Sequence, residues 1–345
     1  MNGPAGKIRL IQAGMGGMGR AWWKSVVRHS PDFDLVAIVD IVEKPLNEAG
    51  DELGVPHDRR FKSLEAALDH VQADAVLTVT PPPVHVEHAR LAFSRGQHLL
   101  TEKPIAHDLE SAKLMVDLAR RAGRQLLVAQ NYRYSQVMQR LKRVVDERPL
   151  GEFGHGHIDF YIPADFTGTF RETMQYPLLV DMAIHHVDLI RFVTGRNITR
   201  VTAHTFRPSW SWYQHHPGLK MLLELEGGIP FSYSGDWSAR GRFTSWNGAW
   251  RLQCAEGSIH LEQDQITLAR CEKWPRQFTQ EQVQIPEAPM NGQAELLRRF
   301  AESIRTNTPG QTSGADNLWS FAVVIAGVIS TRENRTVDVV ELLRA

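Results

Sequence analysis

The sequence predicts an α/β protein in two parts: an N-terminal doubly wound parallel sheet and a C-terminal α+β domain with a large, mostly antiparallel open sheet. Strand and helix patterns alternate up to about residue 130, a glycine-rich turn follows the first strand, and strand patterns without intervening helices dominate residues 151–286. A chain of 345 residues exceeds what one core usually serves. We therefore expect two domains, residues 1–131 and residues 132–345.

The glycine-rich turn connects the first strand to the first helix. Residues 7–13 are typical of a buried strand, and Gly14, Gly16 and Gly19 then fit the pattern G-x-G-x-x-G before a helix over residues 18–30. In a dinucleotide site these glycines allow a tight turn, a close approach of backbone to pyrophosphate, and close packing of helix on strand. The free N–H groups of the helix point at the phosphates. The pattern predicts a Rossmann domain that binds a nucleotide.

Asp40 indicates which dinucleotide is bound. It follows the second strand, residues 33–39, about twenty residues after the glycine turn. A carboxylate at this position accepts hydrogen bonds from the adenosine ribose and repels a 2′-phosphate, and no arginine follows it closely. We therefore expect NAD rather than NADP.

The rest of the first domain continues the alternation. Residues 45–71 hold two short helical patterns, and Ser63 and Asp108 stand where they would cap helices. Strands are expected at residues 74–80, 97–101 and 125–130, and helices at residues 84–94 and 109–122. Three prolines, residues 81–83, turn the chain sharply at the carboxyl edge of the sheet, where open α/β sheets bind ligands.

The second domain begins with a helix over residues 135–147 and continues with strands. We expect them at residues 155–162, 198–206, 220–226, 229–234, 250–253, 258–262 and 265–268. Strands that follow one another without helices argue for an antiparallel sheet with one face covered. Two helices close the chain, residues 293–305 and residues 317–331, and the second is apolar enough to lie in a domain core or an oligomer interface.

A helix between Pro177 and Gly195 interrupts these strands and carries Asp181, His185 and Asp188. Positions i, i+4 and i+7 lie one above another on an α-helix, so the three side chains would form a polar line beside an apolar stripe. A histidine with a carboxylate one turn away suits proton transfer near neutral pH, because the acid orients the imidazole and raises its basicity.

The composition favours a small-molecule partner. Lysine plus arginine, at 39 residues, equals aspartate plus glutamate, at 39, and no basic run suggests nucleic acid. We see no signal peptide and no apolar run of the roughly eighteen residues that a membrane span needs, so we expect a cytoplasmic protein. The only cysteines, Cys254 and Cys271, lack metal-ligand spacing and are too few for a disulfide framework.

Five motifs together resemble the Gfo/Idh/MocA family of oxidoreductases over nearly the whole chain. They are the glycine turn at residues 14–19, Thr80-Pro81-Pro82-Pro83 followed by His85, Glu102-Lys103-Pro104, Asp181-x-x-x-His185-x-x-Asp188, and Ser313-Gly314-Ala315-Asp316-Asn317. The E-K-P and D-x-x-x-H motifs are specific in this order and spacing, whereas the glycine turn alone is not.

The resemblance implies an NAD-dependent dehydrogenase that oxidises a secondary alcohol of a sugar, cyclitol or sugar derivative, or catalyses the reverse reduction. It also implies that Lys103 and His185, from different domains, meet at the nicotinamide. A carbinol that loses a hydride must also lose its hydroxyl proton, so we expect His185 to be the general base. Asp181 would orient it, and Lys103 would stabilise the alkoxide. The family's open sheet often mediates assembly, which implies a homodimer or homotetramer through the C-terminal sheet.

The same resemblance assigns the remaining site residues, with no metal among the ligands. Cofactor contacts are expected from Gly14, Met15, Gly16, Gly17, Met18, Asp40, Thr80, Pro81, His85, Glu102, Lys103 and Asn131. Substrate contacts are expected from Lys103, Tyr132, Arg133, Asp181, His185 and Asp188, although Asp188 could instead pair with Arg191. Trp210, Trp212, Tyr233, Trp237 and Trp246 could stack on a sugar ring, although aromatic residues in sheets often only pack.

Three alternatives remain open. His155 and His157 share one strand face, and Asp181 with His185 has a helical spacing compatible with a divalent ion. Some relatives retain NAD and cleave a glycosidic bond by transient oxidation, which leaves no net redox change. A non-catalytic NAD sensor is disfavoured, because a sensor needs no proton acceptor.

Overall fold

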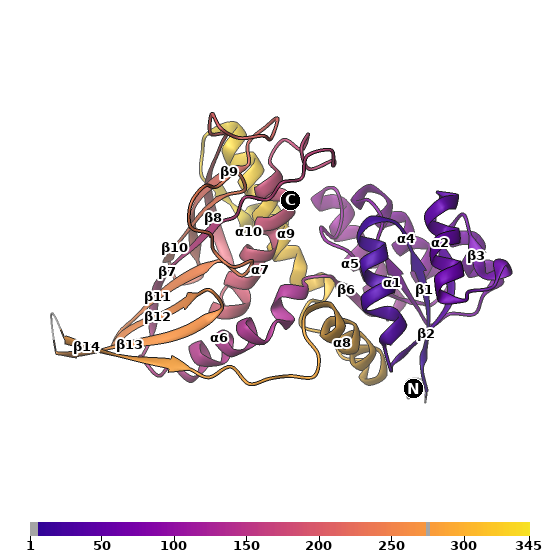
Figure 1. The fold of residues 1–345 in the computed structure, drawn as a ribbon, viewed down its shortest axis with the longest axis horizontal. Helices are drawn as coiled ribbons and strands as arrows, with labels where there is room; N and C mark the ends of the chain where they lie inside the picture. The colour runs from indigo at the N-terminus through magenta and orange to yellow at the C-terminus, as the bar shows by residue number, and fades with distance from the viewer. Residues whose placement is uncertain (1–5, 274–276) are drawn as a thin grey trace. The chain divides into compact units, whose positions relative to one another are not determined.

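The computed structural model describes residues 6–273 and 277–345, and the chain forms two compact units (Figure 1). The first unit contains Met1–Tyr134 and Met290–Leu318, and the second contains Ser135–Pro289 and Trp319–Ala345. The first crossing lies close to the boundary that the sequence predicts at residue 131. The return of residues 290–318 to the first unit was not predicted.

The first unit is built on a parallel sheet of six strands in the order β3-β2-β1-β4-β5-β6. The strands are β1 (Ile8–Ala13), β2 (Phe33–Val39), β3 (Arg60–Phe61), β4 (Ala75–Thr78), β5 (His98–Thr101) and β6 (Leu126–Val128). The helices between them are α1 (Gly17–Ser25), α2 (Glu43–Leu53), α3 (Leu64–His70), α4 (Pro82–Ser94) and α5 (Leu109–Ala122). Strand order reverses between β1 and β4, which is where such sheets bind ligands. The predicted doubly wound sheet is confirmed.

Helix ends in this unit follow the predicted capping chemistry. The hydroxyl of Ser63 accepts a hydrogen bond from the N–H of Ala66, and the carboxylate of Asp108 accepts one from Ser111. Such caps satisfy amide groups that have no partner inside the helix. Helix α1 ends earlier than predicted, at Ser25, and a 3₁₀ turn over Val27–His29 follows it.

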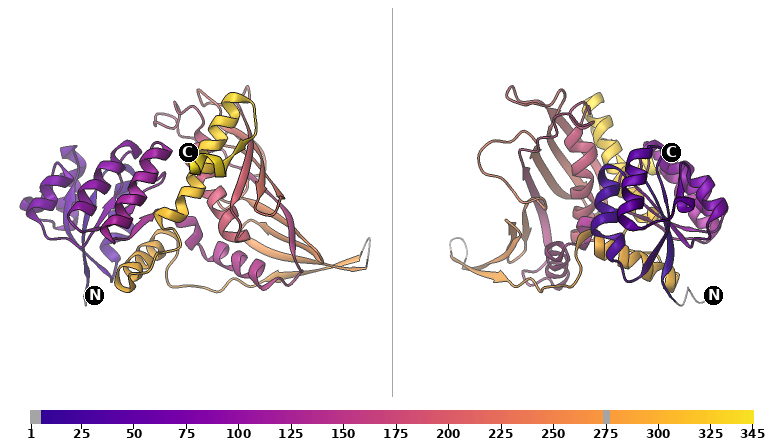
Figure 2. Two further views of the ribbon diagram at one scale, coloured as in Figure 1. Left: turned by 180° about the vertical axis from the view of Figure 1, so that it is seen from behind. Right: turned by 45° about the vertical axis from the view of Figure 1, so that its right-hand side comes forward.

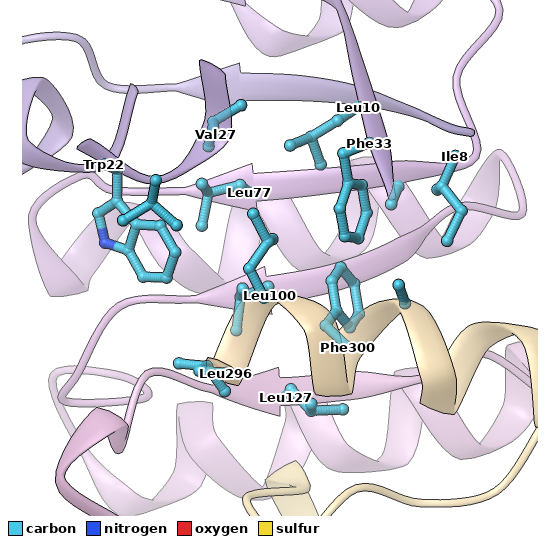
Figure 3. Packing of buried hydrophobic residues seen from close by; sticks show 14 of the residues in the cluster. Ile8, Leu10, Trp22, Val27, Phe33, Leu77, Leu100, Leu127, Leu296 and Phe300 are labelled. Atoms are coloured by element: carbon cyan, nitrogen blue, oxygen red, sulfur yellow. The ribbon is translucent and has the colours of Figure 1, made fainter. Parts of the chain in front are cut away.

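Helix α8 (Gly292–Thr306) packs on the first sheet, although chain order alone suggested the second domain. Its apolar side joins a core with residues of β1, β2, β4, β5 and β6 (Figure 3). The rings of Phe33 and Phe300 stack there, with 5.9 Å between centroids and 14° between planes. Burial of such apolar surface drives the chain back to this sheet.

The second unit holds a nine-stranded sheet in the order β14-β13-β12-β11-β7-β10-β9-β8-β15. Its pairings are antiparallel except between β7 and β10, which confirms a mostly antiparallel sheet. The strands are β7 (Phe153–Tyr161), β8 (Ile198–Phe206), β9 (Gly218–Leu225), β10 (Ile229–Asp236), β11 (Ala249–Cys254), β12 (Gly257–Glu262), β13 (Gln265–Lys273), β14 (Gln277–Val283) and β15 (Val337–Asp338).

Helices cover one face of this sheet (Figure 2). They are α6 (Gln136–Glu147), α7 (Ala183–Thr194) and α9 (Gly314–Glu333), while α10 (Val339–Arg344) follows β15. Burial alternates along β8, so that Val201 and Ala203 are buried while Thr202 and His204 are exposed. This alternation is that of a sheet with one open face.

The predicted helix between Pro177 and Gly195 differs from an ordinary amphipathic α-helix. It begins with a π-helical turn over Leu178–Met182, continues as α7, and ends at Gly195 in the left-handed conformation. Every residue from Ala183 to Val193 is buried, so His185 and Asp188 are buried together with the predicted apolar stripe beside them. A helix packed on all sides has no solvent face, and its polar residues must find partners inside the unit.

Helix α9 corrects the expectation that no segment is apolar enough to span a membrane. Within the described part of the chain it is the one helix long and apolar enough to do so, and 56% of the relevant window is buried inside the protein. The core helix of a soluble protein has the same properties.

Candidate active site

A cavity of about 480 Å³ opens at the carboxyl edge of the first sheet, beside the switch between β1 and β4. Its walls come from the glycine turn, from the end of β2 with Asp40, from the N-terminus of α3, and from the segment that begins with Thr80 and Pro81 and runs into α4. A pocket at this point of a doubly wound sheet is where a nucleotide is expected.

Gly14 and Gly19 have the structural tasks that their positions predict. Gly14 has a φ of +92°, and a Cβ there would lie 2.1 Å from the carbonyl oxygen of Val79, so only glycine fits the turn. A Cβ on Gly19 would lie 2.1 Å from the carbonyl oxygen of Gly14, so only glycine allows the helix to pack this closely. Gly16 lines the cavity and would meet nothing nearer than Pro45 at 3.8 Å, which leaves its backbone open to a ligand.

Asp40 is tied to the glycine turn. Its Oδ2 accepts a hydrogen bond from the N–H of Met15 at 2.8 Å, and its Oδ1 accepts one from Val42, also at 2.8 Å. Carboxylate oxygens accept more than one hydrogen bond, so both can still receive ribose hydroxyls from the cavity. The carboxylate is therefore held in place before any ligand arrives.

Apolar side chains on the cavity walls are unusually exposed. Ile41 is 84% and Val84 is 38% exposed, and both line the cavity. Met18, on the helix after the turn, is also half exposed. Exposed apolar walls around a glycine cradle and a fixed carboxylate fit a dinucleotide, which combines a flat apolar base with ribose hydroxyls.

The loop that carries Lys103 is fastened from two helices. Glu102, which is buried, accepts a hydrogen bond from the indole of Trp22 in α1 at 2.7 Å and one from the N–H of Lys103 at 3.0 Å. His85 in α4 is fully buried, with Nε2 2.8 Å from the carbonyl oxygen of Thr80 and Nδ1 3.1 Å from that of Ile105. These contacts fix the backbone around Lys103.

His85 and Glu102 were both predicted to contact the cofactor, and the geometry indicates a different use of their polar atoms. Both ring nitrogens of His85 face backbone carbonyls, and burial lowers its pKa. Both carboxylate oxygens of Glu102 receive hydrogen bonds from the protein. His85 joins the loops after β4 and β5, and Glu102 joins the loop after β5 to α1.

Asn131, Tyr132 and Arg133 lie in a 3₁₀ turn, Asn131–Tyr134, at the carboxyl end of β6. Arg133 is buried; it donates to the carbonyl oxygen of Gln311 and pairs with Asp316, each at 2.7 Å. These contacts fasten the segment before α9 to the first sheet. Asn131 and Tyr132 are half-buried.

In the second unit, Asp181 and His185 occupy consecutive turns of the π and α segments. Asp181 accepts a hydrogen bond from Nε of Arg171 at 2.5 Å, and His185 is buried. Asp188 accepts a hydrogen bond from the hydroxyl of Ser320 at 2.6 Å and lies 3.9 Å from Nη1 of Arg191. The pairing with Arg191 weighed from sequence is therefore present.

Two family models together cover most of the chain. Residues 8–130 match an oxidoreductase family with an NAD-binding Rossmann fold, and residues 138–260 match the GFO/IDH/MocA C-terminal domain. The chain belongs to the Gfo/Idh/MocA oxidoreductase family. NAD is the cofactor of its first unit, and the cavity there fits it.

Individual members of the Gfo/Idh/MocA family share less than 30% of their residues with this chain in the comparisons below. The chain is 28% identical to a D-apiose dehydrogenase of Paraburkholderia graminis over 90% of this chain and 84% of that protein. It is also 28% identical to an inositol 2-dehydrogenase of Arthrobacter sp. over 64% of this chain and 65% of that protein. An oxidoreductase of Agrobacterium radiobacter, solved with NAD⁺, L-tartaric acid and magnesium, has the same fold, with a TM-score of 0.86 at 22% identity over 98% of this chain and 100% of that one.

Several residues at or near the candidate site were not singled out from the sequence. Gln12, inside β1, donates from Nε2 to the carbonyl oxygens of Gly14 and Gly19, at 3.1 and 2.9 Å. Thr78 contacts His88 at 2.6 Å, and His88 lines the cavity with its pKa lowered to about 4 by burial. The one available signal was a polar residue inside each apolar strand pattern, since such residues need buried partners.

The metal alternative gains no support from geometry. His155 is exposed, and His157 contacts the hydroxyl of Ser232 at 2.7 Å and Asp159 at 3.0 Å. Within residues 6–273 and 277–345, no group of three or more histidine, cysteine, aspartate or glutamate side chains is arranged to hold a metal ion.

Proposed function

We propose that the chain oxidises a secondary alcohol of a sugar, cyclitol or sugar derivative with NAD, or catalyses the reverse reduction. The observation that carries this proposal is the fastened Glu102-Lys103 loop beside a cavity built for NAD. Relatives that are named D-apiose dehydrogenase and inositol 2-dehydrogenase support this substrate class.

In this proposal His185 is the general base. When bound, NAD supplies the carbon that accepts the hydride. His185 takes the hydroxyl proton as the alcohol becomes a carbonyl, and the positive charge of Lys103 stabilises the alkoxide that develops. The carboxylate of Asp181, held by Arg171, stabilises the imidazolium from the preceding turn.

Among the predicted substrate contacts, Lys103, Tyr132, Asp181 and His185 are retained in the proposal. Arg133 and Asp188, both buried, already form ion pairs within their own units, which supports a role in holding the site together. Their contact with substrate remains a prediction.

Replacing Lys103 or His185 by alanine tests the proposal. Loss of a proton-transfer or charge-stabilising group is expected to lower kcat by about 10²-fold to 10⁴-fold while NAD binding, measured by calorimetry, changes little. The exposed His155→Ala variant is the matched control and should keep its activity. Unchanged turnover in Lys103→Ala or His185→Ala would falsify the role of that residue.

The identity of the product separates this reaction from the NAD-retaining alternative. Stoichiometric NADH formation from a panel of inositols, aldoses and their acid and amino derivatives is expected. Release of a free sugar from a glycoside without NADH accumulation would instead favour transient oxidation and bond cleavage.

We also propose that the chain forms a homodimer or homotetramer through the open face of the second sheet and acts in the cytoplasm. Leu222, 60% exposed in the middle of β9, supports an interface on that face. Light scattering of the purified chain tests assembly, and a monomer at micromolar concentration would contradict it. Cell fractionation tests the location.

A further inference from the structure

Five aromatic residues of the second unit could stack on a sugar ring, and their exposure separates them. Tyr233 and Trp237 are 1% exposed and belong to the core. Trp212 is half-buried. Trp210 and Trp246 are 48% and 45% exposed, so only these two of the five present a large free ring surface.

The loop that carries Trp246 is held rigidly. Ser245 and Asn247, the residues on either side of Trp246, both donate hydrogen bonds to Asp264. The hydroxyl of Ser245 donates at 2.6 Å and the side-chain amide of Asn247 at 2.9 Å. The carbonyl oxygen of Asn247 also accepts the indole N–H of Trp250 at 2.7 Å. The ordering of this loop is therefore completed in the fold and need not be repeated when a ligand binds.

The carbonyl oxygen of Trp246 is bound to the helix that carries His185. It lies 3.0 Å from Nε2 of His186, which is fully buried and neighbours His185 in the chain. The ring of Phe160 lies 4.6 Å from that of His186 and 5.9 Å from that of Trp246, measured between centroids. Trp246 therefore lies on the face of the sheet that α7 covers.

A second loop reaches the same helical segment from Asp181. Arg171 donates to Asp181, and its guanidinium lies 4.7 Å from the ring centroid of Phe170, which is 63% exposed. The segment that contains His185 is thus fastened at Asp181 and at His186 to two loops, and each loop presents an exposed aromatic ring.

We propose that Trp246 is a stacking surface for the ring of a cyclic sugar or cyclitol whose hydroxyl is presented to His185. This inference rests on the proposed function. A six-membered polyol ring exposes a flat face of C–H groups that covers an indole, whereas an open-chain polyol has no such face and loses rotational freedom on lying flat. A rigid Trp246 therefore selects ring-shaped substrates over open-chain ones.

Trp210 supplies a matched control on the opposite face. Side chains alternate along a strand, so Tyr161, which follows Phe160 in β7, faces away from α7. Tyr161 and Trp210 line one cavity of about 470 Å³ together with Arg240, whose guanidinium lies 5.7 Å from the Trp210 ring centroid. Trp210 matches Trp246 in residue type and exposure but not in location.

The experiment compares Trp246→Ala, Trp246→Phe and Trp210→Ala as the full chain saturated with NAD. The probes are myo-inositol and D-xylose as rings and sorbitol and xylitol as open chains. For Trp246→Ala, KM and the calorimetric Kd for the ring compounds should rise about tenfold, the effect expected for one lost aromatic contact, with little change for the open chains. Trp246→Phe should recover most of the loss, and Trp210→Ala should resemble the parent.

The outcomes separate this inference from the proposed function. Turnover of ring compounds that does not depend on Trp246 would overturn the inference and leave the proposed function standing. Binding that depends on Trp246 without any NADH formation would support the inference and contradict the proposed function. A change in assembly mass by light scattering, with KM for the ring compounds unaltered, would assign Trp246 to a subunit contact and overturn the inference.

Discussion

At the scale of single residues, the Asp40 carboxylate holds the glycine turn, and we predict that it also binds the ribose of NAD. Its oxygens hold the N–H groups of Met15 and Val42, which fixes the glycine turn, and the same oxygens face the cavity where the ribose of NAD is expected. Lys62 lines that cavity too, and its ammonium lies 3.8 Å from Glu43. Removing the charge of Asp40 would leave the ammonium of Lys62 in the same cavity.

Substitution of Asp40 should therefore change cofactor selectivity. Asp40→Asn keeps the shape of the side chain and removes its charge, and Asp40→Ser also removes the acceptor for Met15. Hydrogen bonds to a charged group contribute about 1.5–3 kcal/mol, so we expect the preference for NAD over NADP to fall at least about tenfold in both variants. Asp40→Ser should also weaken binding of both cofactors. Calorimetric Kd values for NAD and NADP measure this, and an unchanged ratio would show that Asp40 does not meet the ribose.

The structural role of a residue could be predicted from the sequence wherever a local pattern determines it. Gly14 and Gly19 in the turn and the caps at Ser63 and Asp108 depend on neighbours in the chain, and their predicted structural tasks are confirmed. The partners of Arg133 and Asp188 are different, because Asp316 and Ser320 lie 183 and 132 residues away. Only folding brings such groups together, so their pairing could not be derived from spacing.

At the scale of elements, strands with a complete apolar pattern were predicted within a few residues, and short edge strands were missed. β2 and β8 have the predicted bounds, whereas β3 and β15 contain two residues each and carry no periodicity. β14 is exposed along most of its length and lacks an apolar face. Such strands are stabilised by pairing with a neighbour more than by their own side chains.

The π turn before α7 is another feature that composition does not reveal. A run of apolar residues around Asp181 and His185 fits an α-helix by its pattern, yet the hydrogen bonds shift by one residue over Leu178–Met182. π turns are often found at functional sites. Here the turn lies between Arg171 and the segment with His185, so the proposed base and its carboxylate stand on either side of the change in helical pitch.

At the scale of the whole molecule, the change of rhythm near residue 130 was enough to predict two sheets of different kinds. The crossing of residues 290–318 back to the first unit could not be predicted, since any amphipathic helix satisfies either sheet. Each unit also buries histidines, and burial outweighs the opposing effect of the nearby Asp74 carboxylate on His98. The pKa values of His88 and His98 in the first unit and of His186 in the second are lowered to about 4, in each case mainly by burial.

These histidines predict that the molecule loses stability in mild acid. Above pH 6.5 each ring is neutral in both the folded and the unfolded chain, so protonation does not reduce the free energy of unfolding. Between pH 6.5 and about 4 the unfolded chain binds a proton that the folded chain does not, and this favours unfolding. Each histidine should then lower the free energy of unfolding by about 1.4 kcal/mol per pH unit in that range. Asp74, whose pKa is lowered by Arg9, loses its contribution only below 3.8, so it does not mask the effect.

Urea denaturation at pH 7 and pH 5 measures this loss, and the unfolding midpoint should fall at pH 5. Burial also lowers the pKa of His85 in the first unit and those of His216 and His260 in the second, so both units should lose stability at pH 5 when their unfolding is followed separately by hydrogen exchange. His186→Asn should flatten the dependence in the second unit alone, and the exposed His155→Asn should leave it as in the parent. Equal midpoints at the two pH values would contradict the prediction. They would mean that protonation of the buried rings does not destabilise the folded chain, although burial disfavours the charged form.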